Sequence, residues 1–275
     1  MTYLLSEEGR RALRALVGKP ILYAFDFDGT LAPIGSNRNL VKMPRATYEW
    51  LKELARRAPC AIVSGRALTD VEGLVKDAVP HLIGNHGIES PLTPAESLAS
   101  AMEICQGWLR ELAARHAEAL KDLGVEVEDK RYTLTIHYRG VAEPVRVRMA
   151  LLLLLQPLSP APRLIFGKSS VNVLPHGLGG KGAAAHALMV HLRQAGLFFV
   201  GDDETDEDVF ELSDGLSMGV RVGRSEQSRA SYYVKHQGEL EEVIRFLVHR
   251  LDRTPESLQR EDRKTAGGRK AANGP

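Results

Sequence analysis

Three short apolar runs, each ended abruptly by polar residues, constrain the fold of this 275-residue chain more than any other feature. A continuous apolar run of this kind is typical of a strand buried on both faces of a parallel sheet. Because helical patterns accompany the runs, the sequence predicts an α/β core with a doubly wound, Rossmann-like parallel sheet. The runs and their polar ends are 21–25 with Asp26-Phe27-Asp28-Gly29-Thr30, 60–63 with Ser64-Gly65-Arg66, and 197–200 with Gly201-Asp202-Asp203-Glu204-Thr205-Asp206.

The stretch between residues 88 and 174 has a different pattern, in which helices alternate with hairpins. Helical patterns are expected at 95–121 and 142–155, and alternating strands at 125–128 with 132–138 and at 163–166 with 170–174. This order predicts an inserted α+β domain with an antiparallel sheet. The core then consists of residues 1–87 and 175–252, and its further expected elements are helices at 6–17 (capped by Ser6), 44–58, 67–76, 181–193, 205–212 and 238–251, and strands at 82–84 and 216–220.

Composition excludes several classes of protein. Hydrophobic residues make up 44% and charged residues 26%, which is ordinary for a globular protein, and 36 basic residues balance 35 acidic ones. This balance predicts neither a nucleic-acid nor a membrane partner. With no signal peptide and no apolar run long enough to span a membrane, we expect a cytoplasmic protein, either a monomer or a weak oligomer. Cys60 and Cys105 are expected to be buried thiols, and the basic, glycine-rich residues 253–275 to be a disordered tail.

The polar residues that end the three runs point to a single site. In open parallel α/β sheets, ligands bind at the carboxyl ends of the strands, so the three clusters are expected to meet. Carboxylates crowded in this way need a cation, and hard oxygen ligands suit Mg²⁺. In Asp26-Phe27-Asp28, one carboxylate is suited to act as a nucleophile and the other as an acid and base. The carboxylates expected to gather are Asp26, Asp28, Asp202, Asp203 and Asp206.

Lys181 follows the glycine-rich stretch 176–180 and begins a predicted helix. Backbone N–H groups at a helix start, together with a fixed cation, form a phosphate site. The position of Lys181 between the second and third polar clusters strengthens this interpretation over that of a surface lysine after a turn.

Taken together, DFDGT, SGR, GKG and GDDETDEDVF resemble the haloacid-dehalogenase superfamily of aspartyl-phosphate phosphatases, over residues 21–251. Within that superfamily the chain is similar to the trehalose-6-phosphate phosphatases, because it also contains GNHG at 84–87, Lys130 before LTIHYR at 134–139, and Gly167-Lys168. The resemblance implies a phosphatase core with the inserted domain as a cap. It also implies hydrolysis of trehalose 6-phosphate, a small sugar phosphate, through an aspartyl-phosphate intermediate.

The resemblance assigns a role to each residue of the core site. It implies that Asp26 attacks the phosphorus and that Asp28 protonates the leaving sugar oxygen and then deprotonates water. Ser64 is implied to bind a phosphoryl oxygen, Arg66 the sugar phosphate, and Lys181 to neutralise charge. Mg²⁺ is implied to be held by Asp26, the backbone carbonyl of Asp28, and Asp202, with support from Asp203 and Asp206.

In the cap, the resemblance implies that the sugar is bound by Glu128 and Lys130, with His86 and Arg139 nearby. The alternative for Glu128 and Lys130 is an exposed hairpin ion pair, and we expect a structural role for His137. Asn172 stands where this subfamily usually has a glutamate, and it is expected to accept a hydroxyl hydrogen bond without charge. This departure leaves open a phosphatase of another glycosyl or pseudo-disaccharide phosphate. A catalytically silent sugar-phosphate-binding domain is a further alternative.

Overall fold

The computed structural model describes residues 1–35, 41–167, 169–212 and 216–252. Lys168 and the predicted tail at 253–275 therefore lie outside the described residues. Within the described part, no helix is both long and apolar enough to cross a membrane.

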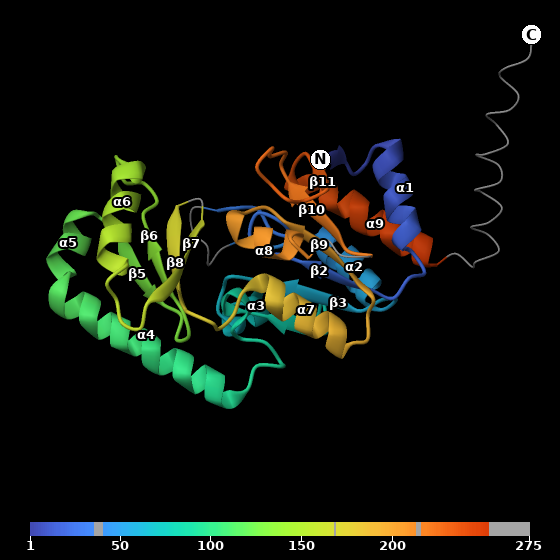
Figure 1. Cartoon of the computed structure of the whole chain (residues 1–275). Coiled ribbons are helices and arrows are strands. Elements are labelled where there is room, and N and C mark those ends of the chain that lie inside the picture. Colours follow the sequence, from blue (N-terminus) through green and yellow to red (C-terminus); the bar gives the residue numbers. More distant parts are fainter. Residues whose placement is uncertain (36–40, 168, 213–215, 253–275) are drawn as a thin grey trace, which may run out of the picture.

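The core is built on a sheet of seven strands that all run parallel, in the order β1-β11-β10-β9-β2-β3-β4 (Figure 1). Its central strands are buried along their whole length, as their continuous apolar runs predict. The strands are β1 (Thr2–Tyr3), β2 (Ile21–Phe25), β3 (Cys60–Val63), β4 (His81–Ile83), β9 (Gly196–Gly201), β10 (Met218–Val222) and β11 (Tyr232–Val234).

Helices cover both faces of this sheet and bury two separate apolar clusters. One face packs against α1 (Glu7–Leu16), α2 (Arg45–Ala55), α3 (Leu68–Val75) and α9 (Leu240–Leu251). The other face packs against α7 (Lys181–His191) and α8 (Glu207–Phe210). Because both faces are covered, side chains can reach solvent or ligands mainly at the ends of the strands.

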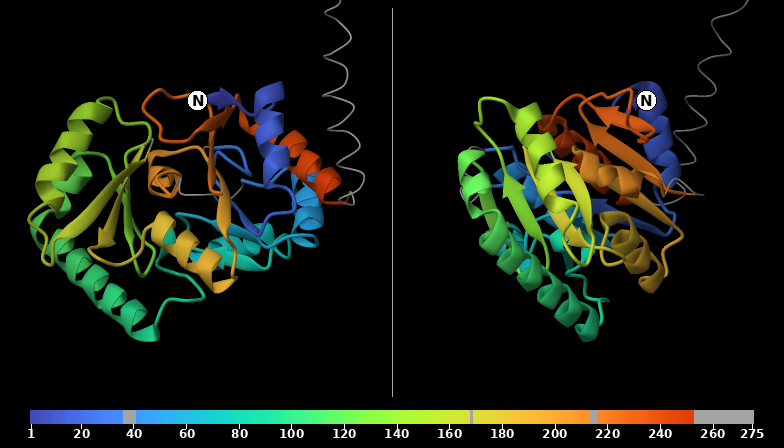
Figure 2. Two further views of the ribbon diagram at one scale, coloured as in Figure 1. Left: turned by 45° about the vertical axis from the view of Figure 1, so that its right-hand side comes forward. Right: turned by 60° about the vertical axis from the view of Figure 1, so that its left-hand side comes forward.

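The inserted segment forms a second sheet, antiparallel, in the order β5-β6-β8-β7. Its helices cover the face turned away from the core, so the opposite face of the sheet looks toward the core (Figures 1 and 2). The elements are α4 (Ala95–Arg115), α5 (Ala117–Asp122), β5 (Glu126–Asp129), β6 (Leu134–His137), α6 (Pro144–Leu155), β7 (Pro162–Gly167) and β8 (Ser170–Pro175).

Strand alternation decides which cap side chains face the core. Leu134 and Ile136 of β6, like Val171 and Val173 of β8, pack into the apolar cluster beneath the cap helices. Because successive side chains point to opposite faces of a strand, Thr135, His137 and Asn172 lie on the other face.

The predicted fold class is confirmed, with differences in single elements. The expected helix at 95–121 is broken at His116, whose backbone leaves the helical region (φ −130°, ψ 9°). The expected helix at 205–212 is a short 3₁₀ turn at Glu204–Asp206 followed by α8, and the expected strand at 216–220 is β10. The short strands β1 and β11 were not expected. The boundaries of the cap at 88 and 174 stay a prediction.

Candidate active site

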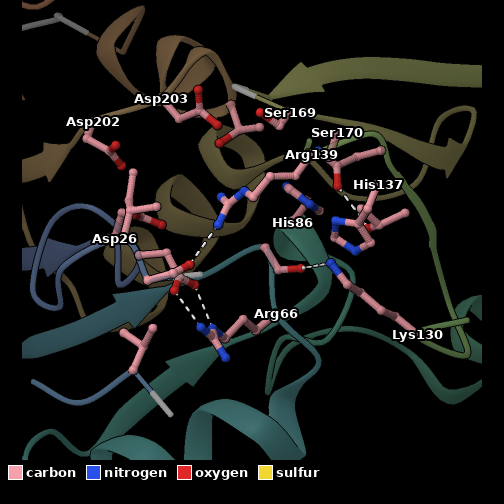
Figure 3. A pocket seen from close by; sticks show the side chains of 18 of the residues that line it. Asp26, Arg66, His86, Lys130, His137, Arg139, Ser169, Ser170, Asp202 and Asp203 are labelled. Carbon is pink, nitrogen blue, oxygen red and sulfur yellow. Dashed lines mark hydrogen bonds and ion pairs between the residues drawn. The ribbon is translucent and has the colours of Figure 1, made fainter. Parts of the chain in front are cut away.

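The carboxyl ends of β2, β3 and β9 meet the polar face of the cap sheet at a cavity of about 600 Å³. Figure 3 shows side chains from both parts converging on it. From the core come Asp26, Asp28, Arg66, His86, Lys181, Asp202 and Asp203, and from the cap Glu126, Lys130, Thr135, His137, Arg139, Ser169, Ser170 and Asn172.

A buried lysine joins two carboxylates on the floor of the cavity. Lys181 Nζ donates to Asp26 Oδ1 and to Asp206 Oδ1, both at 2.7 Å. Asp206 Oδ2 in turn accepts from the backbone amides of Asp202 and Asp203, at 2.9 and 3.0 Å. Lys181 thus links the nucleophile candidate after β2 to the loop after β9.

Close backbone approach makes room for these carboxylates. Gly29 has a φ of +84°, and a Cβ at this position would lie 2.2 Å from Asp202 Oδ2. A Cβ on Gly201 would lie 2.4 Å from the Asp206 carboxyl carbon. Each glycine therefore leaves space that a carboxylate fills.

The charges of this cluster do not balance. Burial, together with the neighbouring carboxylates of Asp206 and Asp202, raises the pKa of Asp26 well above its ordinary value, although Lys181 opposes the shift. Burial disfavours the charged form of Lys181, but Asp206 and Asp26 outweigh it and raise the lysine's pKa. One cation therefore faces three buried carboxylates, which favours a further positive charge.

Carboxylate oxygens of Asp26, Asp202 and Asp206 lie within 4.8 Å of one another, and all three residues are buried. A hard-oxygen donor set with a surplus of negative charge fits Mg²⁺. Lys181 donates to Asp26 and Asp206, so these two carboxylates would share their charge between the lysine and a bound metal ion.

Asp28, the acid–base candidate, forms a bidentate pair with Arg66. Arg66 Nε donates to Asp28 Oδ2 at 2.6 Å and its terminal nitrogen to Oδ1 at 2.5 Å. Ser64 is buried beside them, and its Oγ accepts from the Arg66 backbone amide at 3.2 Å. The loop after β3 thereby fixes the orientation of the carboxylate after β2.

The turn after β4 brings His86 into the site. Asn85 and His86 both have left-handed backbones, with φ of +47° and +53°, and both are buried. The His86 ring lies against Gly65, where a Cβ would be 2.5 Å away. Burial, with help from Lys130 and Lys181, lowers the pKa of His86 well below its usual value, so its imidazole is neutral near pH 7.

The cap contributes a polar wall and several contacts with the core. Lys130 Nζ donates to the Gly65 carbonyl at 2.9 Å and lies 3.9 Å from Glu128 Oε2. Glu128 Oε2 also lies 2.8 Å from His137 Nε2. The side chains of Glu128 and Lys130 are 13% and 8% exposed, so the alternative of an exposed hairpin pair is wrong.

Arg139 and Asn172 complete the cap wall. Arg139 donates to the Gly35 carbonyl of the core at 2.7 Å. Asn172 accepts from Thr135 Oγ1 at 2.9 Å and donates to the Ile165 carbonyl at 3.3 Å. The amide of Asn172 is therefore held within the cap sheet at the edge of the cavity.

Of the thirteen residues singled out from the sequence, ten line the cavity. The other three stand directly behind it: Ser64 against Arg66, Glu128 against His137, and Asp206 against Lys181. The sequence reasoning missed Glu126, His137, Ile34, Gly35 and Val41, which also line the cavity. His137 lines the cavity, where a structural role was expected. The register of the first hairpin, which pairs Glu126 with His137, was the available signal.

A family model described as trehalose-phosphatase matches residues 24–237. The chain belongs to the trehalose-phosphatase family. The trehalose-phosphate phosphatase of Mycobacterium avium is 31% identical over 221 residues, which are 75% of this chain and 55% of that protein. Trehalose 6-phosphate phosphatase RA3 of Zea mays is 29% identical over 265 residues, 86% of this chain and 72% of the maize protein.

The chain is also similar to an uncharacterized glycosyl hydrolase of Mycobacterium tuberculosis. It is 31% identical over 223 residues, which are 78% of this chain and 17% of the hydrolase. The chain therefore matches only a small part of that relative's length.

Solved structures share the overall fold of this chain. The C-terminal domain of the Candida albicans trehalose-6-phosphate phosphatase matches with a TM-score of 0.71 at 18% identity, covering 90% of this chain and 98% of that one. The sucrose-phosphatase of Synechocystis matches with a TM-score of 0.52 at 19% identity, covering 83% and 98%. At these identities, the likeness concerns the fold.

Proposed function

We propose that this chain is a Mg²⁺-dependent phosphatase that hydrolyses trehalose 6-phosphate to trehalose and inorganic phosphate. The observation that carries the proposal is the buried Asp26–Lys181–Asp206 cluster, with Asp202 beside it, at the floor of a cavity roofed by a polar cap. Membership of the trehalose-phosphatase family supports the same activity.

Asp26 is the proposed nucleophile. Its carboxylate oxygen attacks the phosphorus, the bond from phosphorus to the sugar oxygen breaks, and an aspartyl phosphate forms. Asp28 gives a proton to the leaving sugar oxygen, and Arg66 holds the Asp28 carboxyl in the required orientation. Lys181 neutralises negative charge on Asp26 and on the phosphoryl oxygens.

The second step returns Asp26 to its starting state. Water attacks the phosphorus of the aspartyl phosphate, Asp28 accepts a proton from that water, and the bond from phosphorus to Asp26 breaks. Inorganic phosphate is released. Asp26 and Asp202, with the backbone carbonyl of Asp28, would hold Mg²⁺, while Asp206 orients Lys181 and the Asp202 backbone. When bound, Mg²⁺ would supply positive charge that offsets the negative charge of the phosphoryl group.

The polar lining of the cap favours a sugar as the part of the substrate to which the phosphoryl group is attached. Its cavity wall consists of hydrogen-bonding groups on β5, β6 and β8, among them Glu126, Thr135, His137 and Asn172. Such groups match the hydroxyls of a disaccharide, and a cavity of about 600 Å³ is of the size that holds small ligands. Cap contacts with the core at Gly65 and Gly35 would shield the reacting phosphoryl group from water.

Phosphate release tests the proposal. With Mg²⁺ present, the purified chain should release phosphate from trehalose 6-phosphate in preference to glucose 6-phosphate and sucrose 6-phosphate, and EDTA should abolish release. Release from no phosphate ester, with or without EDTA, would contradict the phosphatase assignment and favour a silent binding domain.

Asn172 favours a second candidate substrate class. Its amide is held by Thr135 and the Ile165 carbonyl, and it carries no charge with which to bind a hydroxyl. A related glycosyl phosphate would be hydrolysed by the same core residues, but its sugar would make different contacts with the cap. Preference for another member of the sugar-phosphate panel would select this candidate over trehalose 6-phosphate.

A further inference from the structure

We propose that Asn85 is a positioning residue, which couples the cap hairpin to the loops that hold the phosphoryl group. The inference rests on the proposed function, and it assigns a role to a buried side chain that the mechanism above does not use. Asn85 is fully buried in the turn after β4, between the core and the cap.

The Asn85 side chain forms three hydrogen bonds, which use both N–H donors and the carbonyl oxygen of its amide. Its Nδ2 donates to Glu89 Oε2 at 2.6 Å and to the Lys130 carbonyl at 3.0 Å. Its Oδ1 accepts from Thr133 Oγ1 at 2.7 Å. Because Nδ2 faces two acceptors and Oδ1 faces a hydroxyl, only one orientation of the amide satisfies this set. Two of the three partners belong to the cap hairpin, and the third, Glu89, follows the turn after β4 and is bonded to Leu68 of the core.

Glu89 and the backbone fix Asn85 from the core side. Glu89 Oε2 also accepts from the Leu68 backbone amide at 2.7 Å, so this carboxylate cannot follow a moving cap without losing a second bond. The backbone amide of Asn85 donates to the Arg66 carbonyl at 2.6 Å. Its left-handed backbone, unusual for a residue other than glycine, is held by these contacts.

The same turn reaches both phosphoryl-binding loops. The backbone amide of His86 donates to the Ser64 carbonyl at 3.0 Å, and the His86 carbonyl accepts from the Gly180 amide at 2.7 Å. Ser64 belongs to the loop after β3, and Gly180 directly precedes Lys181. Residues 85 and 86 therefore connect the hairpin that carries Lys130 to the loops that carry Arg66 and Lys181.

This connection has a consequence for substrate selection. Lys130 Nζ reaches the Gly65 carbonyl from the cap while Asn85 holds the Lys130 carbonyl from the core, so both ends of Lys130 are fixed to the core. Loss of the Asn85 contacts would release the hairpin but leave Asp26, Asp28 and Lys181 in place. The enzyme should then lose more activity on a substrate whose sugar is bound by the cap than on a small phosphate ester.

Thr133→Val tests the inference, because valine has nearly the shape of threonine but no hydroxyl for Asn85 Oδ1. We expect KM for trehalose 6-phosphate to rise about 5- to 30-fold, which is the lower part of the range for an unsatisfied buried acceptor. We also expect kcat/KM for p-nitrophenyl phosphate to stay within about twofold. Thr133→Ser, which keeps the hydroxyl, is the matched control and should behave like the wild type. Equal losses on both substrates, or no loss on either, would overturn the positioning role.

Hydrogen–deuterium exchange gives a second readout that does not depend on the substrate. In Thr133→Val, amide exchange in segments 84–89 and 126–137 should accelerate, whereas Thr133→Ser should leave it unchanged. Unchanged exchange in the valine variant would overturn the inference. If the wild type releases no phosphate at all, the proposed function fails while this comparison still decides the role of Asn85. Thr133→Ala serves as a second variant if the valine protein does not fold.

Discussion

At the residue scale, Asp26 is the proposed nucleophile, and its contacts predict the effect of replacing it. Asp26→Asn removes the nucleophile but keeps the shape of the side chain and one oxygen facing Lys181. We expect phosphate release to fall by about 10³-fold or more, as for other lost nucleophiles. Because burial already disfavours the ionised form of Asp26, thermal unfolding should change little. Wild-type turnover by a folded Asp26→Asn protein would rule out the aspartyl-phosphate route.

Gly29 offers a sharper residue-scale prediction, because Gly18 provides a matched control. Both have a left-handed backbone, with φ of +84° and +80°, but a Cβ on Gly29 would collide with Asp202 while one on Gly18 would meet open space. Gly18→Ala should therefore cost only backbone strain, about 1 kcal/mol, with activity retained. Gly29→Ala should also displace Asp202 and lower kcat by about 100-fold or more.

Circular dichroism melts and phosphate release, measured on both alanine variants, distinguish the two effects. If Gly29→Ala and Gly18→Ala lose stability equally and keep equal activity, then Gly29 is needed only for its backbone conformation and not for the space that Asp202 fills.

At the scale of elements, the sequence predicts the centre of the fold better than its margins. β2 and β3 are predicted to the residue and β9 to within one residue at each end, because buried parallel strands are continuous apolar runs bounded by polar residues. The strands β1 and β11, at one side of the sheet, have only two and three residues, and they form by pairing with each other and with β10. Their existence depends on contacts between distant parts of the chain.

The residues of the site also divide into core residues that the sequence predicts and cap contacts that it does not. The core residues Asp26, Asp28, Lys181 and Asp202 are predictable, because strand ends in a parallel sheet must converge. The cap wall depends on the register of the hairpins and on how the cap meets the core. A local pattern therefore could not reveal the contact between His137 and Glu128, or the Asn85 bonds to the hairpin.

Helix α1 carries an element-scale prediction for stability alone. Ser6, expected from the sequence as its N-cap, accepts from the Gly9 amide at 3.1 Å and donates to the Tyr3 carbonyl at 2.7 Å. Ser6→Ala should destabilise the protein by about 1 kcal/mol and lower Tm by roughly 2–4 °C, without affecting phosphate release. Ser6→Asp, which keeps a capping oxygen, should recover most of the loss in a thermal melt. A Tm equal to that of the wild type for Ser6→Ala would show that the cap bond contributes nothing.

At the scale of the whole molecule, the chain joins a rigid, helix-covered core to a cap whose polar face completes the cavity. The core concentrates negative charge at Asp26, Asp202 and Asp206, and buried Lys181 pairs with Asp26 and Asp206. Such a surplus weakens the folded state, and a divalent cation bound only by that state must strengthen it. Metal binding should therefore be measurable as global stability, independently of turnover.

Mg²⁺ at about 100 times its dissociation constant should stabilise the protein by about 2.7 kcal/mol, which raises Tm by roughly 5–10 °C for a chain of this size. The measurement is a thermal melt in EDTA compared with one in excess Mg²⁺. Asp202→Asn removes one carboxylate of the buried cluster and leaves the Asp26–Lys181–Asp206 hydrogen bonds in place, so this variant should lose most of the Mg²⁺-dependent shift. Asp77→Asn is the control, because Asp77 is an exposed carboxylate that contacts Tyr48 and Lys52 far along the chain from the cluster. If Mg²⁺ stabilises the Asp202→Asn and wild-type proteins equally, the cation binds somewhere other than the buried carboxylates.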